Sequence, residues 1–428
     1  MKVLHFNTYL NGGAAIAARR LHEKLVQCSI NSIFAHHPCV GTDDPTYAPM
    51  FKKVKKLRKA LNSLLFRFPV YPSSYYYLHK RPPGFGDFSF PIAPRNSSLD
   101  LQRQPADIVS LHWIADWIDY PSFFPSIPDS LPIIWTLHDM NPFTGGCHYS
   151  WECEKFKTGC HSCFQLNKKR GPQDISFRFA KIKRQALAGK NIHVVADSRW
   201  LEQQARTSSI LGNAKSFRTI HYGLNTELFK PKDKNLCRKL LDIPETAFVI
   251  CFGAASIDNK LKGFALLKEA LALVHRSHPV YCLLFGCSKS DTVSDFVPHK
   301  SVGSLASIDL QTLVYSAADI FVIPSIYEAF GLTALEAMAC GVPVAGFAAG
   351  GIPDMITPFE NGLLAAPGDV QDLAEKIIYM IEHPEERRNM ARNARQTVMQ
   401  RFTADIQAGK YIELFENLLA GGGQRACA

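Results

Sequence analysis

Short apolar runs alternate with amphipathic stretches along most of the chain. The runs are rich in Val, Ile, Leu and Phe and have the length of strands, which is typical of strands buried on both faces of a parallel sheet. Eight strands are predicted in this way, at residues 2–10, 106–113, 131–139, 191–197, 247–254, 280–286, 318–324 and 341–347. Strands that alternate with helices predict an α/β protein with helices on both faces of its sheets.

The stretches between the strands have helical spacing. The first strand is followed by Gly12 and Gly13 and then by residues 14–29, where Ala, Ile and Leu recur as on one face of a helix. Near the other end, residues 369–402 predict two amphipathic helices that are broken at Pro384, because proline cannot continue a helix.

The strands fall into two sets on either side of the polar stretch 221–235, and 428 residues are too many for one ordinary core. We therefore expect two doubly wound, Rossmann-like domains. The first covers residues 1–223 and the second covers 224–402. A C-terminal helix and tail, residues 403–428, is expected to pack back on the first domain.

Composition excludes several classes of protein. A content of 46% hydrophobic and 20% charged residues is a globular balance, which excludes disordered, collagen-like and coiled-coil chains. No run of 18 apolar residues occurs, and the N-terminus lacks the apolar core of a signal peptide. We expect a cytoplasmic protein.

The most specific pattern lies in residues 324–356. A strand ends at Pro324 and a helix begins at Phe330-Gly331, so the unpaired amides and the positive end of the helix dipole suit an anion such as phosphate. Glu328 would then accept hydrogen bonds from sugar hydroxyls, and Glu336, two turns into the helix, could reach a ribose diol. The alternative is a helix cap at Glu328 and a solvated surface acid at Glu336.

The surroundings of Glu336 weaken that alternative. Residues 329–349 contain no other acidic or basic residue, so this helix is expected to be buried on most faces, where an unpaired carboxylate would be costly.

The segment "YEAFGLTALEAMACGVPV", with its two Glu residues eight apart and the "GGIPD" turn that follows, resembles the retaining glycosyltransferases of the GT-B fold, specifically family four (group 1). The resemblance covers nearly the whole chain and is strongest over residues 315–370. It implies two Rossmann-like domains facing across a cleft, and a nucleotide diphosphate sugar as donor substrate.

Roles for individual residues follow from this resemblance. Glu328 would contact the donor hexose and Glu336 the ribose, while the amides of Phe330, Gly331 and Leu332 would meet the sugar and diphosphate. In the first domain, Gly12 and Gly13 would let a loop approach the diphosphate or acceptor, and His112 would lie near the donor sugar. For His138 and Asp139, at a similar strand end, acceptor contact and a scaffold role both stay open.

One position departs from the family pattern. Family members have an Arg and a Lys six residues apart that neutralise the leaving diphosphate. Here Lys262 is kept, but Ser256 stands at the Arg position, and Lys260 is expected to supply the missing charge. No Asp-X-Asp pair stands at a nearby strand end, so no metal or other cofactor is expected in the transfer step. The resemblance implies a front-face attack in which the leaving phosphate helps to deprotonate the acceptor.

Four of the twelve cysteines lie within residues 147–163. Cys147, Cys153, Cys160 and Cys163 have the spacing C-x5-C-x6-C-x2-C, whose last pair has the usual zinc-site spacing and whose first pair is wider. A structural zinc site, four reduced thiols or one disulfide remain open.

Nearly all of the net charge of +10 comes from residues 45–86, which hold nine Lys and Arg and no acid. Within them, residues 51–68 form a basic amphipathic pattern typical of a helix on an anionic membrane surface. A core helix with a solvated basic face is the alternative. Nucleic-acid binding is not expected, because no groove-reading module is found.

Together these features predict a retaining hexosyltransferase acting on a glycan or lipid-linked acceptor, peripheral on the inner face of the cell membrane. Resemblance of residues 136–160 to colanic-acid-type enzymes suggests bacterial surface polysaccharide synthesis. The alternatives are a nucleotide-sugar epimerase and a catalytically degenerate GT-B scaffold that binds glycan or membrane.

Overall fold

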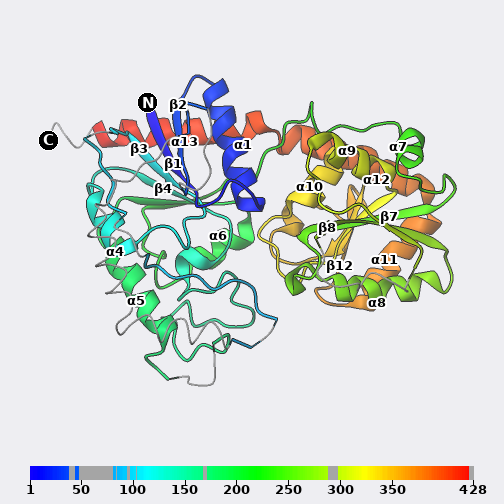
Figure 1. The fold of residues 1–428 in the computed structure, drawn as a ribbon, viewed down its shortest axis with the longest axis horizontal. Helices are drawn as coiled ribbons and strands as arrows, with labels where there is room; N and C mark the ends of the chain where they lie inside the picture. The colour runs from blue at the N-terminus through cyan, green and yellow to red at the C-terminus, as the bar shows by residue number, and fades with distance from the viewer. Residues whose placement is uncertain are drawn as a thin grey trace. The chain divides into compact units, whose positions relative to one another are not determined.

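A computed structural model describes residues 1–37, 44–47, 81–82, 84–93, 97–102, 104–166, 171–287 and 297–423. The chain forms two compact units, Met1–Ile220 with Ala408–Ala428, and His221–Gln407 (Figure 1). The sequence prediction placed the boundaries after residues 223 and 402, so the two divisions differ by a few residues at each boundary.

The first unit is built on a parallel sheet of six strands in the order β2-β1-β3-β4-β5-β6. The strands are β1 (Lys2–Phe6), β2 (Asn31–Ala35), β3 (Ile108–Leu111), β4 (Ile133–Leu137), β5 (Ile192–Ala196) and β6 (Ser216–Thr219). Its helical segments include α1 (Gly13–Gln27), α4 (Tyr120–Phe123), η1 (Phe124–Ser126), η2 (Asn141–Phe143), α5 (Ile175–Leu187) and α6 (Arg199–Arg206). Every residue of β3, β4 and β5 is buried, as expected for strands covered on both faces.

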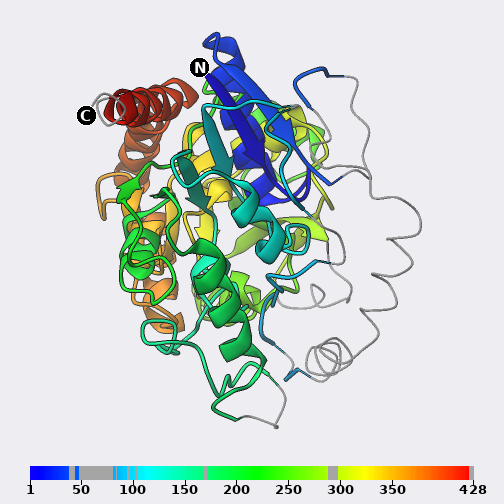
Figure 2. The same ribbon diagram turned by 90° about the vertical axis from the view of Figure 1, so that its left-hand side faces the viewer.

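The C-terminal helix α13 (Ala404–Gly423) lies along the first sheet in Figure 1 and in Figure 2. Its Tyr411, Leu414 and Phe415 belong to the same buried cluster as Val3 and Ile134 of the sheet. The Tyr411 hydroxyl is also 2.8 Å from Oγ1 of Thr136 on β4. Residues from opposite ends of the sequence therefore share one core.

The second unit has a parallel sheet in the order β12-β11-β10-β7-β8-β9. The strands are β7 (Phe248–Ser256), β8 (Val280–Cys287), β9 (His299–Ser301), β10 (Ile320–Ile323), β11 (Val344–Phe347) and β12 (Gly362–Ala365). The helical segments include α7 (Lys234–Leu240), η3 (Lys260–Lys262), α8 (Phe264–His275), α9 (Ile308–Ala317), α10 (Leu332–Ala339), η4 (Ile352–Asp354), α11 (Val370–Glu382) and α12 (Pro384–Arg401). In this unit α8 and α11 cover one face of the sheet, and α9, α10 and α12 cover the other (Figure 1).

These two sheets confirm the predicted α/β class. The predicted helix break is also confirmed, because α11 ends at Glu382 and α12 begins at Pro384. Within the described ranges, no helix is both long enough and apolar enough to cross a membrane. The basic segment 51–68 lies outside the described residues.

Candidate active site

An ion pair lies at the carboxyl ends of two neighbouring strands of the second unit. Lys262 belongs to the short turn η3 after β7, and Glu328 belongs to the loop after β10. Nζ of Lys262 is 2.7 Å from Oε2 of Glu328, and the Ser325 hydroxyl donates to the same oxygen over 3.1 Å. Glu328 is only 8% exposed, so the structure places a nearly buried carboxylate beside a lysine at the sheet edge where α/β proteins bind ligands.

Glycines bring the two loops together. Gly263 has φ +71°, and a Cβ there would lie 1.8 Å from the Pro324 carbonyl oxygen. Gly350 has φ +56°, and its Cβ would lie 2.0 Å from the Glu328 carbonyl oxygen. The Glu328 carbonyl also accepts a hydrogen bond of 2.9 Å from the Gly351 amide. A side chain at either glycine would push the loop that carries Glu328 out of place.

We expect Gly350→Ala to destabilise the second unit and displace Glu328. A left-handed conformation costs an alanine about 1–2 kcal/mol, and the backbone clash adds to that cost. The matched control is Gly368→Ala, because Gly368 has φ +78° and nothing within 4 Å of an added Cβ. Urea unfolding of both variants measures the difference. Equal losses would show that the contact with Glu328 contributes nothing.

The second acid, Glu336, lies on α10 and is 7% exposed. Tyr315 on α9, itself buried, donates its hydroxyl hydrogen to Oε2 of Glu336 over 2.9 Å. Burial, and then the charge of Glu336, raise the pKa of Tyr315 well above its usual value, so this hydroxyl stays protonated and remains a donor. Residues 334–339 are all buried, as the absence of other charges on this helix predicted.

The turn between these acids exposes the start of α10. Gly331 is the N-cap with φ +104°, and the first hydrogen bond of α10 runs from the Leu335 amide to the Gly331 carbonyl. The amides that precede Leu335 therefore have no partner inside the helix. Phe330 is fully buried, with its ring against His221, Tyr222 and Phe402. The aromatic cluster thus fixes the turn whose backbone was predicted to meet the diphosphate.

Ser256, which stands where the family pattern has an arginine, lies at the surface of the same edge of the second sheet. Ser256 ends β7 and is exposed. Lys260 is exposed as well, whereas Lys262 is half-buried in its pair with Glu328. The Asn259 side chain caps the turn by accepting from the Leu261 amide over 3.0 Å. Whether Lys260 replaces the missing arginine stays a prediction.

In the first unit, three histidines form a hydrogen-bonded chain across β1, β3 and β4. Nδ1 of His5 is 3.0 Å from Nε2 of His112, and Nδ1 of His112 is 3.1 Å from Nε2 of His138. Burial lowers the pKa of all three histidines, to about 4 for His138. They are therefore neutral near pH 7, where each imidazole has one donor and one acceptor nitrogen.

The next residue, Asp139, is held by three internal hydrogen bonds. Its Oδ2 accepts from Trp113 Nε1 over 2.8 Å and from His148 Nδ1 over 2.7 Å, and its Oδ1 accepts from the Asn141 amide over 2.8 Å. Burial by itself would raise the pKa of Asp139, but His148 and the hydrogen bonds lower it. These contacts are typical of a carboxylate that positions a loop.

Gly12 and Gly13, in the loop after β1, differ in backbone conformation, because only Gly12 has a positive φ angle. Gly12 is the N-cap of α1 with φ +95°, a conformation that requires glycine. A Cβ at Gly12 or at Gly13 would meet nothing within 4 Å. Both positions therefore leave open space above the start of α1.

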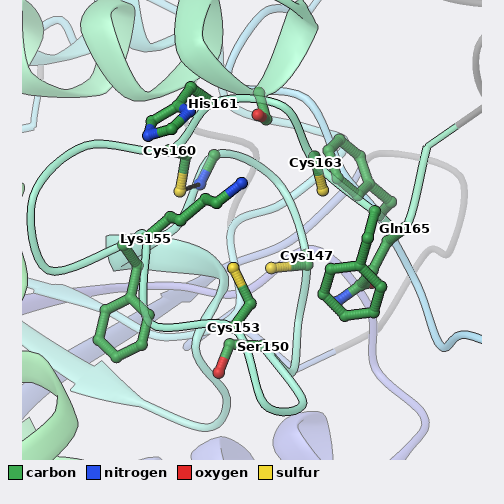
Figure 3. A pocket seen from close by; sticks show the side chains of 13 residues that line it. Cys147, Ser150, Cys153, Lys155, Cys160, His161, Cys163 and Gln165 are labelled. Carbon is green, nitrogen blue, oxygen red and sulfur yellow. Dashed lines mark hydrogen bonds between the residues drawn. The ribbon is translucent and has the colours of Figure 1, made fainter. Parts of the chain in front are cut away.

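The four cysteines line one cavity together with Lys155 and His161 (Figure 3). All four are free thiols, and burial raises the pKa of Cys160 to about 11 and of Cys163 to about 12. In the described part of the chain, no group of three or more His, Cys, Asp or Glu side chains is arranged to hold a metal ion as the side chains stand.

Sequence reasoning missed the partners of the two acids. Ser325, which donates to Glu328, lies two residues after the end of β10, and such a polar residue near a strand end could have been noted. Tyr315 carries no sequence signal toward Glu336, because it lies on the preceding helix, 21 residues away.

Residues 234–397 match the model of a protein family described as "Glycosyl transferases group 1". The matched region lies within the second unit and contains Lys262, Glu328 and Glu336.

Two curated relatives resemble this chain over part of their length. A D-inositol 3-phosphate glycosyltransferase from Saccharomonospora viridis is 30% identical over 225 residues, which cover 47% of this chain and 50% of the relative. An N-acetyl-alpha-D-glucosaminyl L-malate synthase from Bacillus anthracis is 25% identical over 221 residues, 50% of this chain and 57% of the relative. The chain spans about half the length of these relatives.

Solved structures resemble the chain over nearly its whole length. Sucrose-phosphate synthase from Thermosynechococcus elongatus is 20% identical with a TM-score of 0.66, covering 98% of this chain and 99% of that one. HepE from Anabaena, solved with UDP-glucose, is 17% identical with a TM-score of 0.63, covering 97% and 100%. At such identities the likeness shows the fold. The chain has the GT-B fold of two Rossmann-like domains, as predicted.

Proposed function

We propose that this chain is a retaining glycosyltransferase that moves a hexose from a nucleotide diphosphate sugar to a glycan or lipid-linked oligosaccharide. The observation that carries the proposal is the Lys262–Glu328 pair, held 2.7 Å apart inside the region that matches the group 1 family. The buried Glu336 and the structural likeness to HepE, which was solved with UDP-glucose, support a nucleotide-sugar donor. For the acceptor, the resemblance of residues 136–160 favours surface polysaccharide synthesis at the cytoplasmic face of the membrane.

In this proposal the donor binds at the carboxyl edge of the second sheet. Lys262 turns from Glu328 to the diphosphate, and Glu328 then accepts hydrogen bonds from hydroxyls of the hexose. The amides at the start of α10 meet the phosphates. Glu336, oriented by the Tyr315 hydroxyl, accepts from the ribose. When the donor binds, Lys262 and Glu328 lose their contact with each other, and each gains a new partner on the donor.

The chemical step exchanges one bond at the anomeric carbon for another on the same face. The bond to the phosphate oxygen breaks, the bond to the acceptor oxygen forms, and the acceptor proton passes to the leaving phosphate. Lys262, Lys260 and the helix amides stabilise the negative charge that develops on the diphosphate.

In the first unit, the resemblance to the family assigns His112 a role toward the donor sugar. His112 is hydrogen-bonded on both sides, by His5 and His138, so its ring orientation is fixed. Both ring nitrogens of His112 are bonded to these neighbours, so we propose that His112 exchanges one of them for a hydroxyl of the donor sugar when the donor binds. Asp139 and His138 are positioning residues.

A thermal-shift panel of UDP, GDP, ADP and their sugars tests the donor site. A ligand at 100 times its dissociation constant stabilises the fold by about 2.7 kcal/mol, so one nucleotide family should raise the melting temperature of wild type. Glu336→Ala should lose most of that ligand-induced shift. Glu269→Ala, which removes an exposed acid from α8, should retain it. If no nucleotide shifts wild type, the degenerate scaffold becomes the better account.

Product analysis separates transferase from epimerase. A transferase releases nucleoside diphosphate and yields a glycosylated acceptor, whereas an epimerase returns an isomerised donor and no free diphosphate. NMR of the new anomeric centre should show the configuration of the donor. An inverted centre would refute the retaining mechanism.

A further inference from the structure

The cavity in Figure 3 lies in the long connection between β4 and α5, apart from the residues proposed for transfer. We refer to its four cysteines, Cys147, Cys153, Cys160 and Cys163, as the thiol cluster. All four sulfur atoms are directed into the same space. The cavity measures about 20 Å³, which is room for one water molecule or ion.

A backbone amide donates a hydrogen bond to the thiol cluster, and two lysines bring positive charge close to it. The Gly145 amide donates to Sγ of Cys160 over 3.1 Å, a contact that stabilises negative charge on sulfur. Lys155 reaches toward the cavity and donates to the Ser162 carbonyl over 3.3 Å. Lys183 is fully buried and donates to the Thr144 carbonyl over 3.1 Å, next to the loop that bears Cys147. A buried patch of this kind suits anionic sulfur ligands.

The loop around the cavity is held by side-chain hydrogen bonds and burial, and its described residues have no regular secondary structure of their own. After η2, the described residues up to α5 contain no helix or strand. Trp151 and Ser162 adopt positive φ angles of 55° and 46°, which are costly for residues other than glycine. The apolar cluster beneath, which includes Phe88, Leu166 and Phe179, is small. A long loop with these features in a compact domain calls for an additional constraint.

We propose that the thiol cluster binds one thiophilic divalent cation. Four sulfur ligands in tetrahedral arrangement fit zinc best, and the Cys160/Cys163 pair has the spacing of structural zinc sites. Binding requires the four sulfur atoms to move closer together, since they do not stand in ligating positions. Four thiol protons leave to solvent as four metal–sulfur bonds form. Lys155 and Lys183 then offset the net negative charge of the site.

The bound ion would fix the loop that positions Asp139. Cys147 is followed directly by His148, whose Nδ1 donates to Asp139 over 2.7 Å. The His148 carbonyl accepts from the Met140 amide over 2.9 Å, which closes the loop onto the end of β4. An ion that holds Cys147 in place therefore also holds its neighbour His148, and through His148 it holds Asp139. With all four positions taken by sulfur, the ion has a structural role.

Metal analysis of the full chain tests the proposal. Protein purified from zinc-supplemented cells should carry about one zinc per chain. Exchange with cobalt should produce sulfur-to-cobalt charge-transfer absorption. Cys153→Ser and Cys163→Ser, which alter the two half-exposed members, should each lower the zinc content several-fold. Cys28→Ser, which removes an exposed thiol of the same unit, should leave it unchanged.

A second measurement on wild type needs no variant. Chelation should make four additional thiols reactive toward a thiol reagent, and zinc should protect them again. The proposal is overturned if wild type takes up neither zinc nor cobalt. It is also overturned if peptide mapping of the purified protein finds a disulfide within the thiol cluster.

Discussion

Replacing Lys262 with alanine will lower kcat/KM for donor turnover by about 100- to 1,000-fold. This is the usual loss when one group that stabilises developing charge in a transition state is removed. Lys262 is the half-buried partner of Glu328 and the residue proposed to neutralise the leaving diphosphate. Release of nucleoside diphosphate, followed with saturating acceptor, gives the measurement.

The controls separate the two lysines of η3 from general surface charge. Lys260→Ala should cause a smaller loss, and Ser256→Arg in that background should restore the rate if Lys260 stands in for the missing arginine. Lys239→Ala, on the exposed side of α7, should be without effect. Full turnover by Lys262→Ala would remove Lys262 from the site and refute the proposed donor orientation.

Replacing Arg238 with alanine will destabilise the second unit by about 3 kcal/mol, the low end of the cost of breaking a buried ion pair, because Lys234 remains 2.9 Å from Oδ1 of Asp319. Arg238 is buried, and its guanidinium is 2.7 Å from Oδ2 of Asp319. The same oxygen accepts from the Val249 amide over 2.7 Å, so the network ties the starts of β7 and β10 together. The carboxyl ends of these two strands lead to Lys262 and Glu328.

Urea unfolding measures this loss, with Arg388→Ala as the control. Arg388 pairs with Glu385 at the surface, and such pairs contribute about 0–1 kcal/mol. The effect of Arg238→Ala also depends on pH. Burial alone would raise the pKa of Asp319, but Lys234, the Val249 amide and Arg238 lower it. The stabilisation is therefore present above the unfolded pKa of about 3.9 and is lost as pH falls through the folded value. A loss of equal size at pH 7 and below pH 3 would contradict this account.

For the candidate site, sequence alone indicated the residue types but not their contacts. Glu328 and Glu336 were identified from their spacing and from the uncharged helix around them. That Lys262 pairs with Glu328, and that Tyr315 orients Glu336, depends on how β7, α9 and β10 are placed beside each other. The chain of His5, His112 and His138 likewise joins three strands that are neighbours only in the folded sheet.

The eight strands that the apolar runs predicted are the inner strands of the two sheets: β1, β3, β4 and β5 in the first, and β7, β8, β10 and β11 in the second. These strands are covered on both faces, so their residues are apolar. Each therefore appears in the sequence as a short apolar run. The four strands that were not predicted, β2, β6, β9 and β12, are the edges.

Edge strands pair on one side only and are partly exposed, as in β6 and β9, where no residue is fully buried. In β6 and β9 the strand conformation comes from hydrogen bonds to a neighbour and not from an apolar run of their own. The sequence by itself therefore determined the fold class and the inner strands, because burial on both faces of a sheet requires apolar residues locally. Only the tertiary structure decided the edges and the partners of the acids, because these depend on segments far apart in the chain.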